Sequence, residues 1–226
     1  MKKYVIIVAG GTGTRMQGDI PKQFMLLCGK PVILHSIEAF LQYDATMLVI
    51  LVIHIDYLAY WEQLCTEFNI SLLFKVVLGG ETRFESVKNG LTLVEEEGLV
   101  AVHDAARPLV SADFIESIFA EAEANGSAMP GIILNDTIRF IVGDTSHQLD
   151  RTFIRAMQTP QVYKASELKR AYEQPYQPLF TDDASVMQSA GFPLHLTGGR
   201  PDNIKITHPQ DIVVAEALMN FLTTET

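Results

Sequence analysis

The sequence predicts an α/β fold built around a parallel sheet, and three observations support this prediction. Residues 3–9 form a nearly continuous apolar, β-branched run, which is typical of a strand buried on both faces. A glycine-rich loop over 10–16 follows this run directly. Short apolar runs then alternate with helical repeats, beginning with a helix over 31–43 and a strand over 47–53. The glycine loop therefore leaves the end of a buried strand.

The composition limits the class of protein. The 226 residues suit one domain, or one domain with a projecting element, and 48% hydrophobic residues supply ample material for a core. The net charge of −10 argues against a nucleic-acid partner, although a few basic side chains gathered at one site still allow a small anionic ligand. No apolar stretch is long enough to span a bilayer and no targeting segment is evident, so we expect no membrane partner and a cytoplasmic location.

The first half of the chain continues the alternation of helices and strands. A weaker helical stretch over 57–68 precedes an expected strand over 71–78. Thr82 and Glu85 have the spacing of a capping box, which predicts that a helix begins there. Another short buried strand is expected over 99–102.

The second half contains a segment of different character. A helix over 113–124 and a strand over 128–134 are followed by an alternating stretch over 137–142 and a turn at Gly143 and Asp144. This pattern predicts a two-stranded projection from the body. Because such a ribbon is only marginally stable alone, we expect it to pack against a second copy of the protein.

The remaining elements close the chain. A helix is expected over 164–173, and Thr181 is expected to cap another. A strand is expected over 194–196. Thr207 and Gln210 form a second capping-box pattern, which predicts a final helix running to about residue 222.

The glycine loop after the first strand is a candidate anion site. Its backbone N–H groups can cradle phosphate, and Arg15 and Lys22 add two positive charges close by. It is not a Walker A loop, because it lacks the final Gly-Lys-Ser/Thr. The dinucleotide fingerprint lacks its third glycine, where Met16 stands, and its acidic residue, because the second apolar run ends at His54. The alternative is that the glycines serve only a tight turn.

Charged residues follow the strand expected over 99–102. Because open α/β sheets bind ligands beyond the carboxyl ends of their strands, Asp104 is a candidate for orienting a metal ion or substrate. Arg107 is a candidate for holding a phosphate, and a structural salt bridge between the two is the alternative. Arg83 and Ser86 lie in a first helical turn, which favours a polar ligand. The alternative there is a capped surface helix with a solvated arginine.

A set of motifs runs through the chain in a specific order, and on it the chain resembles a known enzyme family. The motifs are Gly11-Thr12-Gly13-Thr14-Arg15-Met16, Pro21-Lys22-Gln23-Phe24, Gly79-Gly80 with Arg83 and Ser86, His103-Asp104-Ala105-Ala106-Arg107-Pro108, Thr159-Pro160-Gln161, Thr181-Asp182 and Asp202-Asn203-Ile204-Lys205. The sequence resembles the 2-C-methyl-D-erythritol 4-phosphate cytidylyltransferases of the non-mevalonate isoprenoid pathway. The resemblance covers essentially the whole chain.

The resemblance implies a fold, a reaction and an assembly. The fold would be one Rossmann-like nucleotidyltransferase domain over 1–226, with a mostly parallel sheet, helices on both faces and a projecting β-arm over 135–157. The reaction would transfer CMP from CTP to 2-C-methyl-D-erythritol 4-phosphate, giving CDP-methylerythritol and pyrophosphate with Mg²⁺ as cofactor. The arm would be exchanged across a homodimer.

The resemblance also implies residue roles. A substrate phosphate oxygen attacks the α-phosphorus of CTP, so catalysis is mainly positioning and charge stabilisation. Arg15 and Lys22 match residues that stabilise the transition state, while Lys205 and Arg151 match those that place the incoming phosphate, with Arg151 coming from the partner's arm. The implied nucleotide-binding residues are Ala9, Gly10, Gly11, Thr12, Gly13, Gly80, Arg83 and Ser86. The implied acceptor contacts are Asp104, Ala105, Arg107, Thr159 and Thr181. Mg²⁺ would lie chiefly on CTP phosphate oxygens, with Asp104 as a weak protein ligand.

One motif departs from the common family pattern. Many members carry Ala-Ala-Gly where this chain has Ala9-Gly10-Gly11, a form that also occurs in ribitol 5-phosphate cytidylyltransferases. The segments 103–108 and 181–185 follow the methylerythritol pattern, so we favour that acceptor over ribitol phosphate. A non-catalytic nucleotide-binding protein is a second rival, which the four implied catalytic cations argue against. A nicotinamide oxidoreductase is a third, which the incomplete dinucleotide fingerprint argues against.

Overall fold

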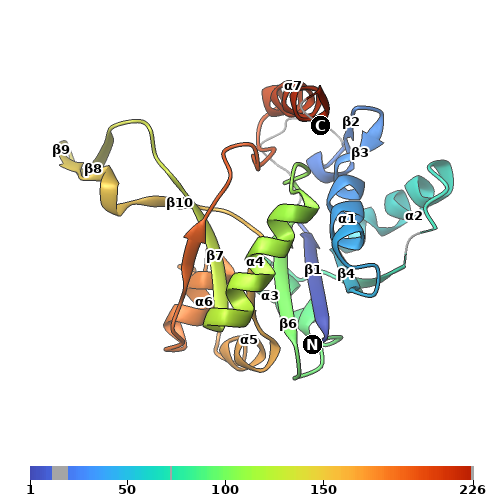
Figure 1. Ribbon diagram of the computed structural model, residues 1–226, viewed down its shortest axis with the longest axis horizontal. Helices are drawn as coiled ribbons and strands as arrows, with labels where there is room; N and C mark the ends of the chain where they lie inside the picture. The colour runs from blue at the N-terminus through green and yellow to red at the C-terminus, as the bar shows by residue number, and fades with distance from the viewer. Residues whose placement is uncertain (12–19, 72, 225–226) are drawn as a thin grey trace.

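The computed structural model describes residues 1–11, 20–71 and 73–224, and its centre is an eight-stranded mixed sheet (Figure 1). Four strands run parallel in the order β6 (Leu99–Asp104), β1 (Lys3–Ala9), β4 (Leu48–Ile53) and β5 (Phe74–Leu78). On the other side of β6, the remaining four are β11 (Gln161–Lys164), β7 (Ser127–Ile133), β10 (Arg155–Met157) and β12 (Leu196–Gly198). β11 is antiparallel to β6 and β7, β10 is antiparallel to β7, and β12 runs parallel to β7. The predicted α/β fold with a mostly parallel sheet is confirmed.

Helices cover both faces of the sheet, because the side chains of β1 alternate between two cores. Val5 and Ile7 are fully buried in one core, and Tyr4 and Ile6 are buried in the other. The first core is covered by α1 (Val32–Tyr43), α2 (Leu58–Glu67) and α4 (Ala112–Asn125), and the second by α3 (Arg83–Leu91), α5 (Ala165–Ala171) and α6 (Asp183–Ser189). The uninterrupted apolar character of β1 is thus explained by burial on both sides.

The register of the central strands brings their carboxyl ends to one edge. Val8 of β1 pairs with Val52 of β4 on one side and with Asp104 of β6 on the other. The chain leaving β5 joins this edge, because the Gly79 N–H donates to the Ile53 carbonyl at 2.8 Å. Loops that are distant in the sequence therefore meet beyond these four strands.

The capping box predicted at the start of α3 is confirmed. The Thr82 hydroxyl accepts a hydrogen bond from the Glu85 N–H at 3.1 Å, and the Glu85 carboxylate accepts from the Thr82 N–H at 3.0 Å. Two orphan N–H groups of the first turn are satisfied in this way. Arg83, the first residue of α3, is held at a fixed place beside the sheet edge.

Two other predicted helix starts differ from the structure: an aspartate caps α6, and at α7 an aspartate inside the helix bonds back to the segment before it. Asp182, not Thr181, caps α6, because its carboxylate accepts from the Ser185 N–H at 2.9 Å. At the start of α7 (Gln210–Thr224), the Asp211 carboxylate accepts from the N–H groups of residues 207 and 208 at 2.7 and 2.8 Å. At α6, a carboxylate is a stronger acceptor for the helix N–H group than a hydroxyl, which explains the preference.

Several strand boundaries also differ from the predictions. β5 begins at Phe74 rather than 71, and β6 continues two residues beyond 102 to Asp104. β12 covers Leu196–Gly198 instead of 194–196, because its partner residues on β7 are Met129 to Gly131. Lys205 lies outside the strands, in a segment that is tied to the sheet edge by the Ile206 N–H, which donates to the Ala106 carbonyl at 2.8 Å.

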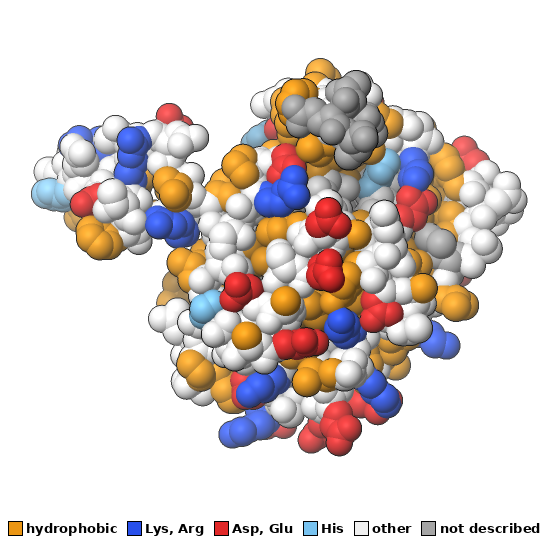
Figure 2. All heavy atoms as spheres, viewed as in Figure 1, with side chains coloured by type: hydrophobic (Ala, Val, Ile, Leu, Met, Phe, Trp, Pro, Cys, Tyr) orange, Lys and Arg blue, Asp and Glu red, His pale blue; other side chains and the backbone are white. Residues whose placement is uncertain are grey.

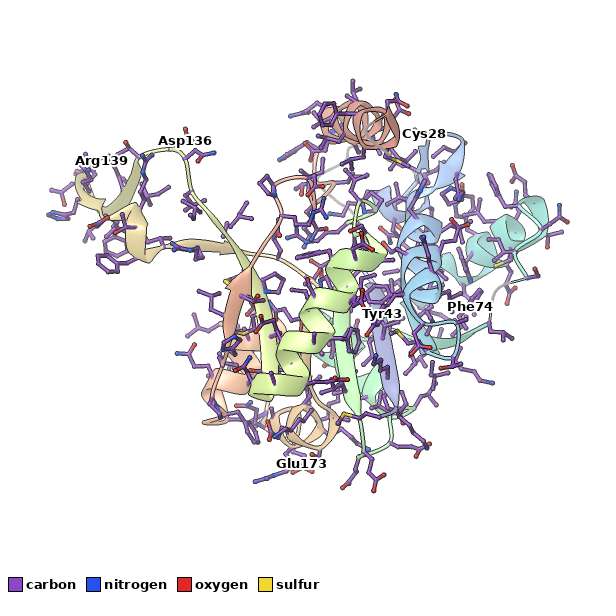
Figure 3. All side chains as sticks on the ribbon, viewed as in Figure 1. Cys28, Tyr43, Phe74, Asp136, Arg139 and Glu173 are labelled. Atoms are coloured by element: carbon purple, nitrogen blue, oxygen red, sulfur yellow. The ribbon has the colours of Figure 1, made fainter. Side chains whose placement is uncertain are left out.

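A hairpin of β8 (Ile138–Val142) and β9 (Thr145–Leu149) forms a two-stranded sheet of its own (Figure 1). It lies to the left of the body in this view, and the labelled Asp136 and Arg139 in Figure 3 lie with it, far from the central sheet. Its surface carries exposed apolar side chains together with basic ones, as Figure 2 shows. Arg151 follows in a short 3₁₀ helix, η4 (Arg151–Phe153).

A smaller third core joins the last helix to the segment that follows the glycine loop. That segment holds η2 (Lys22–Phe24), β2 (Leu26–Leu27) and β3 (Lys30–Pro31), and η3 (Ile55–Tyr57) lies at the end of β4. The third core contains Leu27, Val32, Leu109, Ile206 and Ala215. Within the described ranges, no helix has both the length and the apolar character needed to cross a membrane.

Candidate active site

A cleft of about 370 Å³ lies beyond the carboxyl ends of the central strands. Its described lining comes from the ends of β1, β4 and β6, from the start of α3 and from the segment before α7. The lining residues are Val8, Ala9, Gly10, Gly11, Lys22, Gln23, His54, Gly80, Glu81, Thr82, Arg83, Ser86, Asp104, Ala105, Ala106, Lys205 and Thr207. This is the edge at which open α/β sheets bind ligands.

The glycine side of the cleft is shaped by backbone packing. A Cβ atom on Gly80 would lie 2.3 Å from the Cβ of Glu85, and one on Gly10 would lie 2.9 Å from the Ser86 Oγ. The Ser86 hydroxyl accepts from the Gly80 N–H at 3.2 Å, which joins α3 to the loop after β5. Gln23 is buried and donates from its Nε2 to the carbonyls of residues 9 and 11 at 2.9 and 3.1 Å. The wall is therefore held by close contacts that leave no room for side chains.

The structure brings most of the expected nucleotide-binding residues together in this cleft. Ala9, Gly10, Gly11, Gly80, Arg83 and Ser86 all line it. Thr12, Gly13 and Arg15 lie outside the described residues. Lys22, an expected catalytic residue, lines the same cleft from η2.

A second cavity of about 270 Å³ adjoins the first on the side of β11 and the start of α6. Its lining consists of Arg83, Asp104, Arg107, Met157, Gln158, Thr159, Gln161, Thr181, Asp182 and Lys205. It therefore contains four of the five expected acceptor contacts, whereas the fifth, Ala105, lines the first cleft instead. Three of its residues, Arg83, Asp104 and Lys205, line both cavities and form a shared wall.

The shared wall is an ion-pair network centred on Asp104. Its Oδ1 accepts from Arg83 Nε at 3.3 Å and its Oδ2 from Lys205 Nζ at 2.6 Å. Burial alone would raise the pKa of Asp104, but the charges of Arg83 and Lys205 hold that pKa well below its usual range. Asp104 is therefore ionised at neutral pH. Among the described residues its salt bridges go to these two cations, so the alternative of a structural Asp104–Arg107 bridge is not realised.

Arg107 is buried and bonds to backbone carbonyls. Its Nη1 donates to the Asn203 carbonyl at 2.8 Å and its Nη2 to the Met157 carbonyl at 3.4 Å. Its Nε makes no hydrogen bond within the described part of the chain. Burial lowers the pKa of Arg107 and Asp104 raises it, but a guanidinium remains charged at neutral pH. Arg107 thus supplies positive charge to the second cavity while joining the segments at 157 and 203.

Thr159 is held by a second buried network behind Asp104. The Asp104 N–H donates to Thr159 Oγ1 at 3.0 Å, and that oxygen lies 3.4 Å from His103 Nδ1. His103 Nε2 lies 3.2 Å from the Arg107 carbonyl, which can only accept, so Nε2 carries the proton and Nδ1 accepts from the Thr159 hydroxyl. Burial lowers the pKa of His103 to about 4, so its ring is neutral at pH 7. The Thr159 hydroxyl is therefore fixed in direction.

Arg151 lies apart from Lys22 and Lys205 within one chain. It is exposed on η4 beside the hairpin, lines neither cavity and donates to the Asn135 carbonyl. Within a single chain, the expected catalytic residues Lys22 and Lys205 both line the first cleft. The part that requires the partner's arm stays a prediction.

Sequence reasoning missed residues that line the cleft or support it. His54 lines the cleft, and its Nδ1 accepts from the Asp56 N–H at 3.3 Å. Its position directly after β4 was a usable signal, because ligands bind beyond strand ends. Asp183 is completely buried and accepts a hydrogen bond from Arg83 at 2.7 Å. The two residues are 100 positions apart, and no sequence motif indicates that they are in contact.

Comparisons with known proteins identify the family of this chain. The family model for 2-C-methyl-D-erythritol 4-phosphate cytidylyltransferase, IspD, matches residues 3–221. A protein of that name from Bacteroides thetaiotaomicron is 47% identical over 219 residues, which cover 97% of this chain and 100% of the relative. Its counterpart from Phocaeicola vulgatus is 45% identical over 219 residues, with the same coverage of both chains.

Solved structures show the same relationship. The enzyme of this name from Francisella tularensis superposes with a TM-score of 0.77 at 30% identity, covering 96% of this chain and 100% of that one. The 4-diphosphocytidyl-2C-methyl-D-erythritol synthase from Anaerococcus prevotii gives a TM-score of 0.81 at 23% identity, covering 97% of this chain and 96% of that one, which supports the fold. On the extent of the family match and the identity to these relatives, the chain belongs to the 2-C-methyl-D-erythritol 4-phosphate cytidylyltransferase family.

Proposed function

We propose that this chain transfers CMP from CTP to 2-C-methyl-D-erythritol 4-phosphate, forming CDP-methylerythritol and releasing pyrophosphate. The observation that carries the proposal is the pair of adjoining cavities whose common wall is Arg83, Asp104 and Lys205. One cavity has the close-packed backbone wall that suits a nucleotide, and the other has the charged and hydroxyl groups that suit a sugar-alcohol phosphate. Membership of the family supports the same assignment.

The reaction needs positive charge and alignment rather than a strong base. An oxygen of the acceptor phosphate, already ionised at neutral pH, forms a bond to the α-phosphorus of CTP. The bond from that phosphorus to the bridging oxygen breaks, and the electron pair leaves with pyrophosphate. Lys22 and Lys205 line the cleft from opposite segments and would stabilise the negative charge that develops between them. Arg15 is proposed to act with them, following the family motif.

The nucleotide is proposed to lie against the glycine wall. Because a Cβ on Gly80 or Gly10 would meet Glu85 or Ser86, the backbone there can approach a flat base closely. Backbone N–H and carbonyl groups can then read the edge of the base. Ser86 supports this wall through its bond from the Gly80 N–H.

The acceptor is proposed to lie in the second cavity. The ionised Asp104 carboxylate has lone pairs beyond those used by its two cations, so it can accept from substrate hydroxyl groups. Thr159 Oγ1 keeps one lone pair that can accept from the substrate, and Thr181 offers a second hydroxyl. The buried charge of Arg107 would attract the phosphate.

Mg²⁺ is proposed to bind mainly through the CTP phosphates. Both oxygens of Asp104 bond to cations, and the described residues contain no cluster of three or more histidine, cysteine or acidic side chains that could hold an ion. This donor set fits a metal that arrives with the triphosphate and keeps most of its ligands from phosphate and water. When bound, the ion supplies neutralising charge for the leaving pyrophosphate.

The hairpin is proposed to serve as a dimerisation arm. In the hairpin, Phe140 and Ile141 have exposed fractions of 57% and 63%, and Phe153 of the neighbouring η4 is 87% exposed. Apolar side chains exposed together on a ribbon that is only marginally stable alone mark a surface for another protein. A groove of about 530 Å³ at the base of the hairpin is lined in part by Ile133, Arg155 and Leu196. This groove offers room for a few side chains of a second copy. In such a dimer, the partner's Arg151 would reach the acceptor cavity. The cytoplasmic location stays a prediction.

Exchange between inactive copies tests the arm. Arg151→Ala and Lys22→Ala proteins are purified separately, mixed, and assayed after subunit exchange. Partial recovery of activity is expected, because some sites then receive an intact Lys22 and an intact Arg151. An exchanged mixture without recovery would contradict a shared site.

The acceptor is tested by pyrophosphate release with CTP and Mg²⁺. We expect turnover with methylerythritol 4-phosphate and none with ribitol 5-phosphate. The Gly10 form of the loop is the observation that keeps ribitol phosphate as the second candidate. Turnover with ribitol phosphate alone would move the assignment to that acceptor. Binding of CTP without turnover of either acceptor would instead support the non-catalytic reading.

A further inference from the structure

A chain of four alternating charges crosses the protein from its interior to the cleft. Arg83 Nη2 donates to Asp183 Oδ2 at 2.7 Å, while Arg83 Nε donates to Asp104 Oδ1 at 3.3 Å. Lys205 Nζ then donates to Asp104 Oδ2 at 2.6 Å. The four residues come from α6, α3, the end of β6 and the segment before α7. One arginine therefore connects a buried carboxylate to the carboxylate that lies between the cavities.

Asp183 is the inner end of this chain. Its side chain has no exposed surface, and both of its oxygens are used, because the Tyr172 hydroxyl donates to Oδ1 at 2.6 Å. Tyr172 is itself buried and stacks on Phe84 with ring centroids 4.7 Å apart. Asp183 lines neither cavity, so it does not reach the space in which either substrate would lie.

The other three residues are the shared wall of the two cavities. Arg83 has a long side chain with several rotatable bonds, and Asp183 fixes its far end in one position. Without a negative charge at 183, Arg83 would retain only the Asp104 carboxylate as an acidic partner. It would then compete with Lys205 for that carboxylate, and the charge of the four-residue chain would rise from zero to +1. Both changes act on the place where the two substrates meet.

We propose that Asp183 is a positioning residue for the transfer reaction: acting through Arg83, it holds Asp104 and Lys205 in the arrangement that both substrates require. This inference rests on the proposed function. Asp183 has no contact with substrate in this scheme. Its effect on the reaction passes through the Arg83 guanidinium.

The first test replaces the charge and keeps the shape. Asp183→Asn should lower kcat by about 10- to 100-fold while changing KM for each substrate less, because small misplacements of reacting groups are costly in rate. Tyr172→Phe is the matched control, because it removes the other hydrogen bond of Asp183 and leaves its charge and the Arg83 pair in place. This control should keep most of the activity. Equal losses in the two variants would overturn the proposal, since a purely structural role predicts them.

A double-mutant cycle tests whether the effect passes through Arg83. Arg83→Gln alone should lower kcat, and adding Asp183→Asn to it should lower kcat no further. Losses that multiply would overturn the proposal, because they would mean that Asp183 acts by another route. The double variant also removes both buried charges together, so it remains a usable comparison with Arg83→Gln if Asp183→Asn alone fails to fold.

A measurement without turnover separates this proposal from the proposed function. The Arg83 Nε–H resonance, assigned by its loss in Arg83→Gln, should shift and exchange faster with water in Asp183→Asn but not in Tyr172→Phe. An unchanged resonance in Asp183→Asn would overturn the positioning role whatever the activity. Wild-type protein that fails to release pyrophosphate from CTP with either acceptor would overturn the proposed function, while this resonance still decides how Arg83 is held.

Discussion

The two cavities of the site are built from different materials. The nucleotide cleft owes its shape to backbone at Gly10 and Gly80, where an added methyl group would collide with residues of α3. The acceptor cavity owes its shape to charged side chains, with Asp104 held between Arg83 and Lys205. A wall of packed backbone is sensitive to added volume, whereas a wall of ion pairs is sensitive to changed charge. Substitutions can therefore be chosen that damage one cavity and leave the other.

The largest effect is expected from a cation that both substrates face during the reaction. Lys22→Ala should lower kcat by about 10²- to 10³-fold and change CTP affinity far less, because its charge matters most as the transition state forms. Steady-state kinetics and CTP calorimetry provide the two numbers. Lys75→Ala, an exposed lysine on the edge strand β5, is the control for loss of a surface charge. Equal losses of binding and turnover in Lys22→Ala would contradict this role.

Added volume should damage the nucleotide side alone. Gly80→Ala places a Cβ 2.3 Å from the Glu85 Cβ, so the backbone must move, at a cost of about 1–3 kcal/mol. We expect KM for CTP to rise by about tenfold or more while KM for the acceptor changes little. Gly10→Ala should be milder, because its neighbour at 2.9 Å is the Ser86 hydroxyl, a side-chain atom that can move. A larger rise of KM for CTP in Gly10→Ala than in Gly80→Ala would contradict the prediction that the contact at Gly80 is the less tolerant one.

The acceptor side should impose a pH dependence on stability. The pKa of His103 falls from 6.5 to about 4 in the folded protein because the ring is buried, so between these values the unfolded chain binds more protons. The contribution of His103 to the free energy of unfolding is complete above pH 6.5 and is lost as the pH falls through this window. At pH 5 the loss is about 2 kcal/mol. Urea unfolding at pH 7 and pH 5 measures it, with His103→Gln as the comparison. The same pH dependence in both proteins would assign it to other groups.

The smallest effect is expected from a hydroxyl in the acceptor wall. Thr159→Val removes the acceptor of the Asp104 N–H, and we expect a loss of about 1 kcal/mol, or about fivefold in KM for the acceptor. Thr159→Ser keeps the hydroxyl and is the matched control. The expected pattern is an acceptor KM that rises only in the valine variant, with KM for CTP unchanged in both. A rise in KM for CTP would show that the two walls are not separable at this residue.

The difference between the cavities also decides how much of the site the sequence could predict. Glycines next to a buried strand are visible in a sequence, so the cleft beside Gly10 and Gly80 could be placed in advance. The motif at the end of β6 placed Asp104 at the ligand-binding edge, but its ion-pair partners are Arg83 and Lys205 and not the neighbouring Arg107. The Asp104–Arg107 bridge, considered as the alternative, does not form because Arg107 bonds to the carbonyls at 157 and 203.

The helix starts show the same limit on a smaller scale. A capping box was predicted correctly at Thr82, where threonine and glutamate are the only suitable pair. At α6, Asp182 stands beside Thr181 and accepts from the Ser185 N–H instead. At α7, Asp211 inside the helix accepts from the N–H of Thr207. The spacing of residues could not predict which side chain accepts from the N–H groups near a helix start, because several candidate acceptors stand close together in the sequence.

The alternation of β1 between two cores has a consequence for how the molecule opens. Because Ile6 and Ile7 are buried on opposite faces, neither helical layer can detach without exposing part of the same strand. The two layers should therefore unfold as one cooperative unit, and the amides of β1 should exchange with solvent only through global unfolding. The loop that begins at Gly10 would then start from the end of a slowly exchanging strand. Substrates would thus enter and leave beside a strand end that is anchored in both cores.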